Sequence, residues 1–197
     1  MNILRRGERV RVFIGIELSN QVKEYLDKVS RIVQTNSYKG NFTRFSNYHI
    51  TIKYIGEATS ADLDTLEEMM DYVGSTHEAF YLTLEDLGSF TKRGKHIIWM
   101  GLNQGKNRLK RIFNVFESLM EENGFERDQR KYQPHITLGK NIQSSYEQSN
   151  VKIPGYKKRL LVDKLTLFWS HREQDDLVYT PIYECKLQKQ IRQQEEV

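Results

Sequence analysis

The chain alternates between segments with a two-residue hydrophobic period and segments with a period of three to four residues. A period of two is typical of strands with one buried face, and the longer period is typical of amphipathic helices. Residues 20–32, 60–73 and 106–122 are therefore predicted to form helices. The strands are predicted over residues 10–18, 42–45, 47–56, 80–90, 96–102, 135–140, 160–169 and 178–187.

The order of these elements indicates the fold class. Strands 80–90 and 96–102 are separated only by a polar turn that contains Gly94, which predicts a hairpin. A doubly wound parallel sheet would place a helix after each strand, whereas here several strands follow one another directly. We therefore expect an α+β fold of antiparallel sheets flanked by helices. One domain is expected over residues 1–187, followed by a polar tail, 188–197, that we expect to fray.

The composition is that of a globular protein with a mild positive charge. Hydrophobic residues make up 38% and charged residues 28% of the 197 positions, and the formal net charge of +4 favours a polyanionic partner. Cys185 is the only cysteine, so no internal disulfide or thiolate-based metal site is expected. The N-terminal segment lacks the apolar run of a signal peptide or membrane span, which predicts a cytoplasmic protein without a membrane partner.

Two of the five histidines, His49 and His135, open a His-Ile-Thr tripeptide 86 residues apart, and each lies on a predicted strand. Side chains at positions i and i+2 of a strand share one face, so each histidine stands beside its own threonine, Thr51 or Thr137. If the two halves of the chain face each other about an approximate twofold axis, the cleft between them holds two imidazoles and two hydroxyls.

This set of groups suits phosphoryl chemistry. One imidazole can remove a proton from water while the other, protonated, donates to a departing ribose oxygen, because the pKa of histidine lies near neutrality. The threonine hydroxyls would donate hydrogen bonds to the non-bridging phosphate oxygens. A single histidine on a half-buried strand is more often structural, but the duplication of the motif counts against that interpretation. Two histidines without a carboxylate nearby leave too few ligands for a metal, so neither a metal nor a cofactor is expected.

The chain resembles the bacterial and archaeal RNA 2′,3′-cyclic phosphodiesterases, also called 2′-5′ RNA ligases, of the two-histidine phosphoesterase superfamily. The resemblance covers nearly the whole chain and rests on Arg11-Val-Phe-Ile-Gly-Ile-Glu-Leu18, Tyr48-His-Ile-Thr-Ile-Lys-Tyr-Ile-Gly56, Ile98-Trp-Met-Gly101 and Tyr132-Gln-Pro-His-Ile-Thr-Leu138. It implies a bilobal fold with two antiparallel sheets lining a central cleft and helices outside. It also implies hydrolysis of a 2′,3′-cyclic phosphate to a 2′-phosphate without a metal.

The resemblance assigns roles to the motif residues. It makes His49 the proton donor and His135 the proton acceptor, with Thr51 and Thr137 binding phosphate; the nearly symmetric motifs do not distinguish donor from acceptor by themselves. Many family members continue the second motif as His-x-Thr-Leu-x-Arg, whereas this chain has Lys140 at the last position. A lysine keeps the charge but loses the bidentate geometry of arginine. Strict alternation places Lys140 on the face opposite the histidine unless a bulge at the preceding glycine restores it, and we expect Lys140 to be a phosphate contact.

The remaining histidines and several aromatic residues are secondary candidates. We expect surface or supporting positions for the other histidines, although the strand end that carries His171 and Arg172 could reach the cleft. Aromatic side chains could stack on a base, as they do in single-strand recognition. The residues considered for stacking are Phe45, Tyr48, Tyr132 and Trp169.

The leading hypothesis is a monomeric enzyme whose partner is an RNA or oligonucleotide ending in a 2′,3′-cyclic phosphate. One alternative is a module of the same fold that binds a mononucleotide and does no chemistry. Another is ligation of 2′-5′ bonds, which is the formal reverse of the cleavage and uses the same two histidines. A third is a basic RNA-binding protein in which the motifs are fortuitous.

Overall fold

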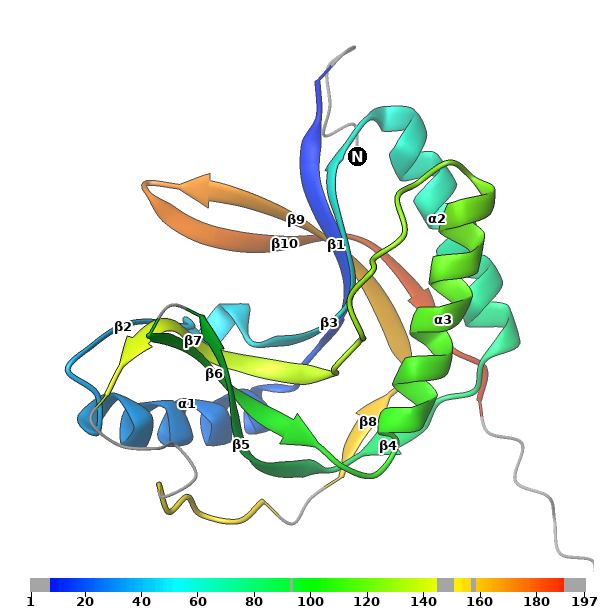
Figure 1. The fold of residues 1–197 in the computed structure, drawn as a ribbon. Coiled ribbons are helices and arrows are strands. Elements are labelled where there is room, and N and C mark those ends of the chain that lie inside the picture. Colours follow the sequence, from blue (N-terminus) through cyan, green and yellow to red (C-terminus); the bar gives the residue numbers. More distant parts are fainter. Residues whose placement is uncertain (1–7, 93, 145–150, 157–158, 190–197) are drawn as a thin grey trace, which may run out of the picture.

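The computed structural model describes residues 8–92, 94–144, 151–156 and 159–189. These residues form two antiparallel four-stranded sheets, a small two-stranded sheet and three α-helices (Figure 1). The predicted α+β fold class is confirmed.

Each four-stranded sheet contains one of the two motif strands. The first sheet has the order β10 (Asp176–Lys186), β9 (Lys164–Glu173), β1 (Val10–Glu17), β3 (His49–Ala58). The second sheet has the order β2 (Lys39–Phe42), β7 (His135–Gln143), β6 (Lys95–Leu102), β5 (Leu84–Lys92). The small sheet pairs β4 (Phe80–Leu82) with β8 (Leu160–Val162).

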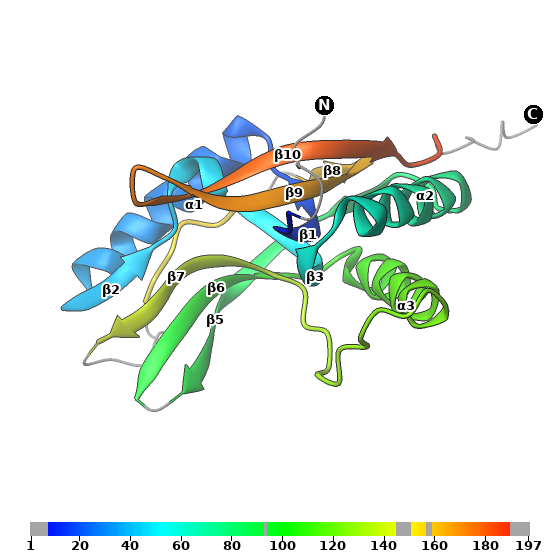
Figure 2. The ribbon, with the colours of Figure 1, turned by 90° about the horizontal axis from the view of Figure 1, so that it is seen from above.

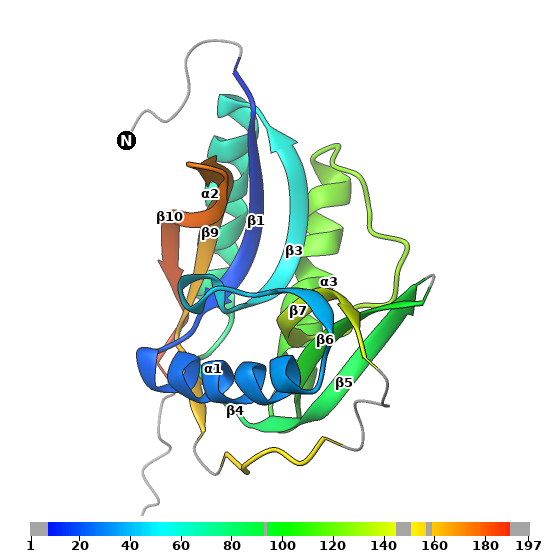
Figure 3. The same ribbon diagram turned by 90° about the vertical axis from the view of Figure 1, so that its left-hand side faces the viewer.

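Two of the three helices, α1 and α3, follow a strand of one sheet and pack against the other sheet. Helix α1 (Asn20–Thr35) follows β1 of the first sheet, yet it packs against β2 and β7 of the second (Figure 3). Helix α3 (Lys106–Glu122) follows β6 of the second sheet, yet it packs against β3 of the first and against α2 (Ser60–Thr76). Figure 2 shows α2 and α3 side by side at one end of the molecule and α1 at the other. Each sheet is therefore covered by a helix that follows, along the chain, a strand of the other sheet.

Local sequence explains where the helices form. In α1 the buried residues Val22, Leu26, Val29 and Val33 follow the spacing of one helical face. Helix α2 begins with a capping box, in which the Thr59 side chain accepts from the backbone of Asp62 and the Asp62 carboxylate accepts from the backbone of Thr59.

Helix α2 packs closely on β10 at a glycine. A Cβ atom added at Gly74 would lie 2.7 Å from the carbonyl oxygen of Lys186 and 3.4 Å from Sγ of Cys185, so a larger residue there would push the helix away from the strand. Cys185 is buried beneath this contact, and burial raises the pKa of its thiol to about 11.

Two of the predicted strands are divided in the structure. The predicted strand 80–90 is β4 and β5, which separate at Thr83 and belong to different sheets, and the predicted strand 160–169 is β8 and β9, which separate at Asp163. The four buried side chains of the small sheet, Phe80, Leu82, Leu160 and Val162, continue the hydrophobic pattern of the neighbouring strands, which hides the change of sheet. The short strand predicted at 42–45 is β2 at Lys39–Phe42, followed by a 3₁₀ turn at Phe45–Asn47.

Part of the predicted polar tail is held by backbone hydrogen bonds. The N–H of Ala79 donates to the carbonyl oxygen of Gln188 at 2.7 Å, and the N–H of Gln188 donates to that of His77 at 2.9 Å. Residues 190–197 of the tail lie outside the described residues. In the part of the chain that the structure describes, no helix has the length and apolar character needed to cross a membrane.

Candidate active site

A cavity of about 740 Å³ lies where the two motif strands meet. His49 and Thr51 of β3 line it, as do Thr137 and Lys140 of β7, and β3 packs against β7. His135 is not one of the lining residues, but it lies close enough for its charge to lower the pKa of His49. The structure therefore brings both halves of the duplicated motif to one place.

Both histidine rings are anchored in the same way. Nδ1 of His49 lies 2.7 Å from the carbonyl oxygen of Asn47, and Nδ1 of His135 lies 2.6 Å from that of Gln133. A carbonyl oxygen can only accept a hydrogen bond, so Nδ1 carries a hydrogen in both rings and Nε2 is the nitrogen that gains or loses a proton. Nε2 of His49 also lies 3.0 Å from Oγ1 of Thr51. The sequence thus presents two imidazoles with the same nitrogen available for chemistry.

Aromatic side chains surround both rings. The ring of His49 lies 4.7 Å from Phe13 and 5.0 Å from Tyr179, between centroids. The ring of His135 lies 5.2 Å from Phe90 and 5.7 Å from Trp99.

Burial among these rings lowers the pKa of both histidines. It lowers the pKa of His49 to about 4, and the positive charge of Lys140 adds to the effect. The pKa of His135 is also lowered, first by burial and then by Lys140. Both rings are therefore neutral near pH 7 in the protein without substrate. A bound anion would favour their protonated forms, because an opposite charge stabilises the charged state.

A bulge occurs at the same position of both motifs. Gly15 of β1 pairs with Thr51 and Ile14 pairs with Lys53, which leaves the intervening residue of β3 without a partner; Trp99 pairs with Thr137 and Ile98 with Gly139, which does the same on β7. The bulged residues are Ile52 and Leu138. In each strand two consecutive residues are consequently buried, Ile52 with Lys53 and Leu138 with Gly139.

The bulge explains the position of Lys140. After two consecutive inward residues, the next side chain returns to the face of the histidine. Lys140 on β7 and Tyr54 on β3 occupy these equivalent positions, and both line the cavity. Lys140 therefore lies on the same side as Thr137, through a bulge at Leu138 rather than at Gly139, where the sequence placed it.

Two further walls line the cavity; the sequence indicated that the strand end with Arg172 could reach it, but not the segment with Arg44. The β9–β10 hairpin contributes Arg172 and Tyr179, and the segment after β2 contributes Arg44. Arg44 forms an ion pair with Asp176 of the hairpin, and Nδ2 of Asn47 donates to the carbonyl oxygen of Leu177 at 2.7 Å. These residues belong to neither motif, and the fold brings them to the cavity that His49 lines.

His171 does not line this cavity, although the adjacent Arg172 does. Its ring stacks on Trp169 with centroids 3.9 Å apart, and its Nε2 lies 2.8 Å from Oγ1 of Thr180. The strand end thus reaches the cleft through its arginine.

The stacking role considered for Tyr48 is wrong, because this residue is buried, and Tyr132 is half-buried, does not line the cavity and has other partners. Tyr48 is 1% exposed. Tyr132 stacks on Phe113 at 4.3 Å, and its hydroxyl donates to the carbonyl oxygen of Thr51 at 2.9 Å. Burial raises the pKa of Tyr132, so the hydroxyl remains a donor. Tyr132 lies three residues before His135, and this bond ties the segment that leads to the second motif to the first motif.

A buried ion pair supports the same junction. Nζ of Lys53 on β3 contacts Oε1 of Glu117 on α3, with side chains 5% and 3% exposed. The other carboxylate oxygen of Glu117 accepts from the backbone N–H of Asp128 at 2.9 Å. The segment between α3 and β7 is therefore attached to the first sheet at two points.

Among the described residues, no group of three or more histidine, cysteine, aspartate or glutamate side chains could hold a metal ion. The polar groups that line the cavity include an imidazole, hydroxyls, an ammonium and two guanidinium groups, together with amides and the carboxylates of Asp175 and Asp176. The basic groups and hydroxyls can bind an anion, and the imidazole can transfer a proton.

Comparisons with known proteins identify relatives that match most of the chain. A family model described as the 2′-5′ RNA ligase superfamily matches residues 19–174. The RNA 2′,3′-cyclic phosphodiesterase of Escherichia coli (strain K12) is 25% identical over 176 residues, which cover 89% of this chain and 96% of the relative. The enzyme of the same description from Thermotoga maritima is 21% identical over 182 residues, which cover 91% and 96%.

Solved structures show the same fold. The structure of E. coli LigT in apo form has a TM-score of 0.79 and 23% identity, and the match covers 92% of this chain and 99% of that one. The complex of E. coli LigT with 3′-AMP has a TM-score of 0.77 and the same identity, with 91% and 99% covered.

Proposed function

The chain belongs to the 2′-5′ RNA ligase superfamily, and we propose that it is an RNA 2′,3′-cyclic phosphodiesterase that forms a 2′-phosphate by two-histidine catalysis without a metal. One observation carries the proposal: both motif histidines are anchored through Nδ1 at the junction of β3 and β7, beside a cavity that Thr51, Thr137 and Lys140 also line. The relatives described as RNA 2′,3′-cyclic phosphodiesterases support the reaction class.

In the proposed reaction a water molecule attacks the phosphorus atom of the cyclic phosphate. Nε2 of His135 accepts a proton from this water as the new P–O bond forms. Nε2 of His49 donates a proton to O3′ of the ribose as the P–O3′ bond breaks, which leaves the phosphate on O2′. Each proton transfer contributes roughly 10²- to 10⁴-fold to the rate. The assignment of donor and acceptor follows the resemblance to the family.

The phosphate would be held by the groups beside the histidines. The hydroxyls of Thr51 and Thr137 would donate to the non-bridging oxygens, and the ammonium of Lys140 would neutralise the charge that grows there in the transition state. The same negative charge also raises the pKa of His49 in the complex. Substrate binding would thereby supply the protonated ring that the free protein lacks.

The test is incubation with an oligonucleotide that ends in a 2′,3′-cyclic phosphate, in the presence of EDTA. We expect conversion to the 2′-phosphate, and His49→Ala and His135→Ala should each lower kcat by roughly 10²- to 10⁴-fold or more. His77→Ala is the matched control, because His77 lies at the end of α2 and not at the cavity. No conversion, a 3′-phosphate product, or loss of activity on chelation would contradict the proposal.

A mononucleotide-binding module is a second candidate, favoured by the relative that was crystallised with 3′-AMP. Titration with 3′-AMP separates the two. Saturable binding without product from any cyclic substrate would favour the binding module, whereas turnover favours the enzyme. Ligation of 2′-5′ bonds would use the same histidines in the reverse direction, and the yield of joined product from two RNA fragments measures it directly.

A further inference from the structure

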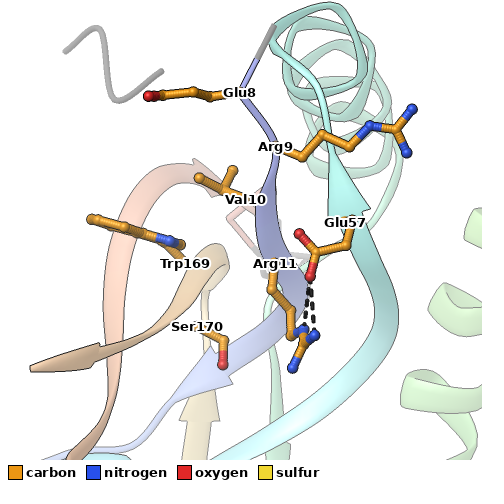
Figure 4. A pocket seen from close by; sticks show the side chains of 7 residues that line it. All are labelled: Glu8, Arg9, Val10, Arg11, Glu57, Trp169 and Ser170. Carbon is orange, nitrogen blue, oxygen red and sulfur yellow. Dashed lines mark hydrogen bonds and ion pairs between the residues drawn. The ribbon is translucent and has the colours of Figure 1, made fainter. Parts of the chain in front are cut away.

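A second cavity, of about 530 Å³, adjoins the candidate active site. Ser170 lines both cavities, so they share a wall. The residues that line the second cavity are Glu8, Arg9, Val10, Arg11, Glu57, Trp169 and Ser170 (Figure 4).

The divergence of two strands creates this cavity. The pairing of β1 with β9 ends at Val12 and Trp169, and beyond that point β9 remains paired only with β10 in the described residues. Strand β1 continues along β3, where Arg11 pairs with Glu57. The β9–β10 hairpin therefore separates from the N-terminal end of β1, as Figure 1 shows, and the cavity fills the angle between them.

The chemistry of the walls suits a nucleotide. Nε and one terminal nitrogen of Arg11 donate to Oε1 of Glu57 at 3.2 and 3.0 Å, so three of the five N–H groups of the guanidinium remain for other acceptors. Trp169 is half-buried and lines the cavity, with one face of its indole stacked on His171, and Arg9 adds a second guanidinium. Cationic groups beside an aromatic ring are the combination that binds the backbone and bases of single-stranded nucleic acid.

Arg11 and Ser170 lie on the face of the first sheet that carries the active site, whereas Trp169 pairs with Val12 and presents its ring from the other face, at the gap beside β1 (Figure 4). Arg11 shares its face of β1 with Phe13, which packs against the ring of His49. Arg11 lies four residues along β1 from Gly15, the partner of Thr51, which corresponds to about 13 Å. A mononucleotide with its phosphate beside His49 would leave Arg11 unengaged, whereas a longer strand would reach it.

We propose that the cavity around Arg11 and Trp169 binds a nucleotide of the RNA that lies upstream of the terminal one, so that the protein selects oligonucleotides over cyclic mononucleotides. This inference rests on the proposed function for the position of the RNA end. The phosphate of the upstream nucleotide contacts Arg11, and its base lies against Trp169.

Binding measurements test this without requiring turnover. A 5′-labelled tetranucleotide with a 3′-phosphate is titrated by fluorescence anisotropy, and 3′-AMP is titrated by calorimetry. We expect Arg11→Gln to raise the Kd of the tetranucleotide roughly tenfold and to leave that of 3′-AMP unchanged. The slope of log Kd against log salt should fall by about 0.7, the value for one phosphate contact on a single strand.

The chain offers a matched control and a second variant that should have the opposite effect on tetranucleotide affinity. Arg31 on α1 is exposed and forms an ion pair with Asp27 at 2.9 Å, so Arg31→Gln removes the same charge and a similar ion pair elsewhere. Glu57→Gln removes the carboxylate that competes for Arg11 and should tighten tetranucleotide binding. Equal effects of Arg11→Gln and Arg31→Gln, or an equal loss of 3′-AMP affinity in Arg11→Gln, would overturn the inference.

The inference and the proposed function fail separately. If the wild-type protein hydrolyses no cyclic phosphate but Arg11→Gln still weakens only tetranucleotide binding, the upstream nucleotide site is supported and the proposed reaction is contradicted. If the wild-type protein hydrolyses cyclic phosphates but binds the tetranucleotide no more tightly than 3′-AMP, the upstream nucleotide site is contradicted and the proposed reaction is supported.

Discussion

His49 and His135 share an anchor but differ in their neighbours. Each donates Nδ1–H to the carbonyl oxygen two residues earlier, which leaves Nε2 for the substrate. Phe13, Phe168 and Tyr179 surround the first ring, whereas Phe90 and Trp99 contact the second. Lys140 lowers the pKa of both. The lysine therefore has two opposed effects, since it attracts phosphate and discourages the protonated ring that the reaction needs.

The pH profile of kcat/KM should show the effect of Lys140 on the protonation of the two histidines. This quantity reports ionisations of the free enzyme, and the pKa of both histidines lies below the ordinary 6.5, with that of His49 at about 4. We expect the optimum on the acidic side of 6.5, with activity declining as the pH rises. Lys140→Met removes a positive charge that lowers both pKa values, so the optimum should move to higher pH while its height falls.

Lys39→Met, on β2 outside the cavity, is the control for the change of charge and should leave the position of the optimum unaltered. An optimum that stays in place or moves to lower pH in Lys140→Met would show that the lysine does not set the proton affinity of the pair.

At the scale of elements, the segment before β7 determines how the second motif meets the first. Its attachments to the first sheet are the hydroxyl of Tyr132 on the carbonyl oxygen of Thr51 and the carboxylate of Glu117 between Lys53 and the backbone of Asp128. These bonds join β3, α3 and the start of β7. We infer that they maintain the separation of the two imidazoles.

Tyr132→Phe tests the first attachment. The ring stacking on Phe113 is retained, while the carbonyl oxygen of Thr51 loses a donor, so the free energy of unfolding should fall by about 1–3 kcal/mol. We also expect kcat to fall more than KM rises, because a displaced base loses alignment rather than affinity. Urea denaturation and steady-state kinetics measure the two effects, and Tyr72→Phe, at an exposed site on α2, should change neither. Unchanged kcat in Tyr132→Phe would limit the bond to a structural role.

Glu117→Gln tests the second attachment. It leaves the ammonium of Lys53 buried without a counter-charge, which costs about 3–5 kcal/mol when a buried pair is broken. Glu121→Gln is the control on the same helix, since Glu121 is 61% exposed and its pair with Arg127 contributes about 1 kcal/mol or less. Similar losses of unfolding free energy in the two variants would mean that the buried pair is no more important than an exposed one.

Much of this arrangement could be predicted from periodicity and the duplicated motif, including the three helices, both motif strands and the position of His49 beside Thr51. The bulges at Ile52 and Leu138 could not, because an extra residue leaves the hydrophobic pattern intact and shifts only the side chains after it. The buried Lys53 could not be predicted either, since its partner lies 64 residues away. The wall that contains Arg44 depends on its long-range contact with Asp176 of the β9–β10 hairpin, which no local pattern encodes.

At the scale of the whole molecule, helices α1 and α3 make the two sheets interdependent. Helix α1 follows a strand of the first sheet and packs on the second, and α3 follows a strand of the second sheet and packs on the first. The first sheet also takes β1 and β3 from the beginning of the chain and β9 and β10 from its end. Neither sheet can keep its packing if the other unfolds.

The two tryptophans allow a test of this cooperativity. Trp99 lies on β6 of the second sheet and Trp169 on β9 of the first, and the chain contains no other tryptophan. Trp99→Phe and Trp169→Phe each leave one fluorescent reporter. We expect each variant to unfold in urea in one transition whose fluorescence midpoint coincides with that of its circular dichroism. Separate transitions for fluorescence and circular dichroism would show that the sheets unfold independently.

The contact between Gly74 and β10 gives the protein a chemical reporter of its own motion. Helix α2 covers the only thiol in the chain, and with a pKa of about 11 little of Cys185 is thiolate at neutral pH. An alkylating reagent needs both access and the thiolate, so the native protein should be labelled far more slowly than the same protein in urea. The rate of Cys185 alkylation, measured by mass spectrometry, then reports how frequently α2 separates from β10. Labelling of the folded protein at the rate seen in urea would mean that α2 does not protect Cys185 from the reagent.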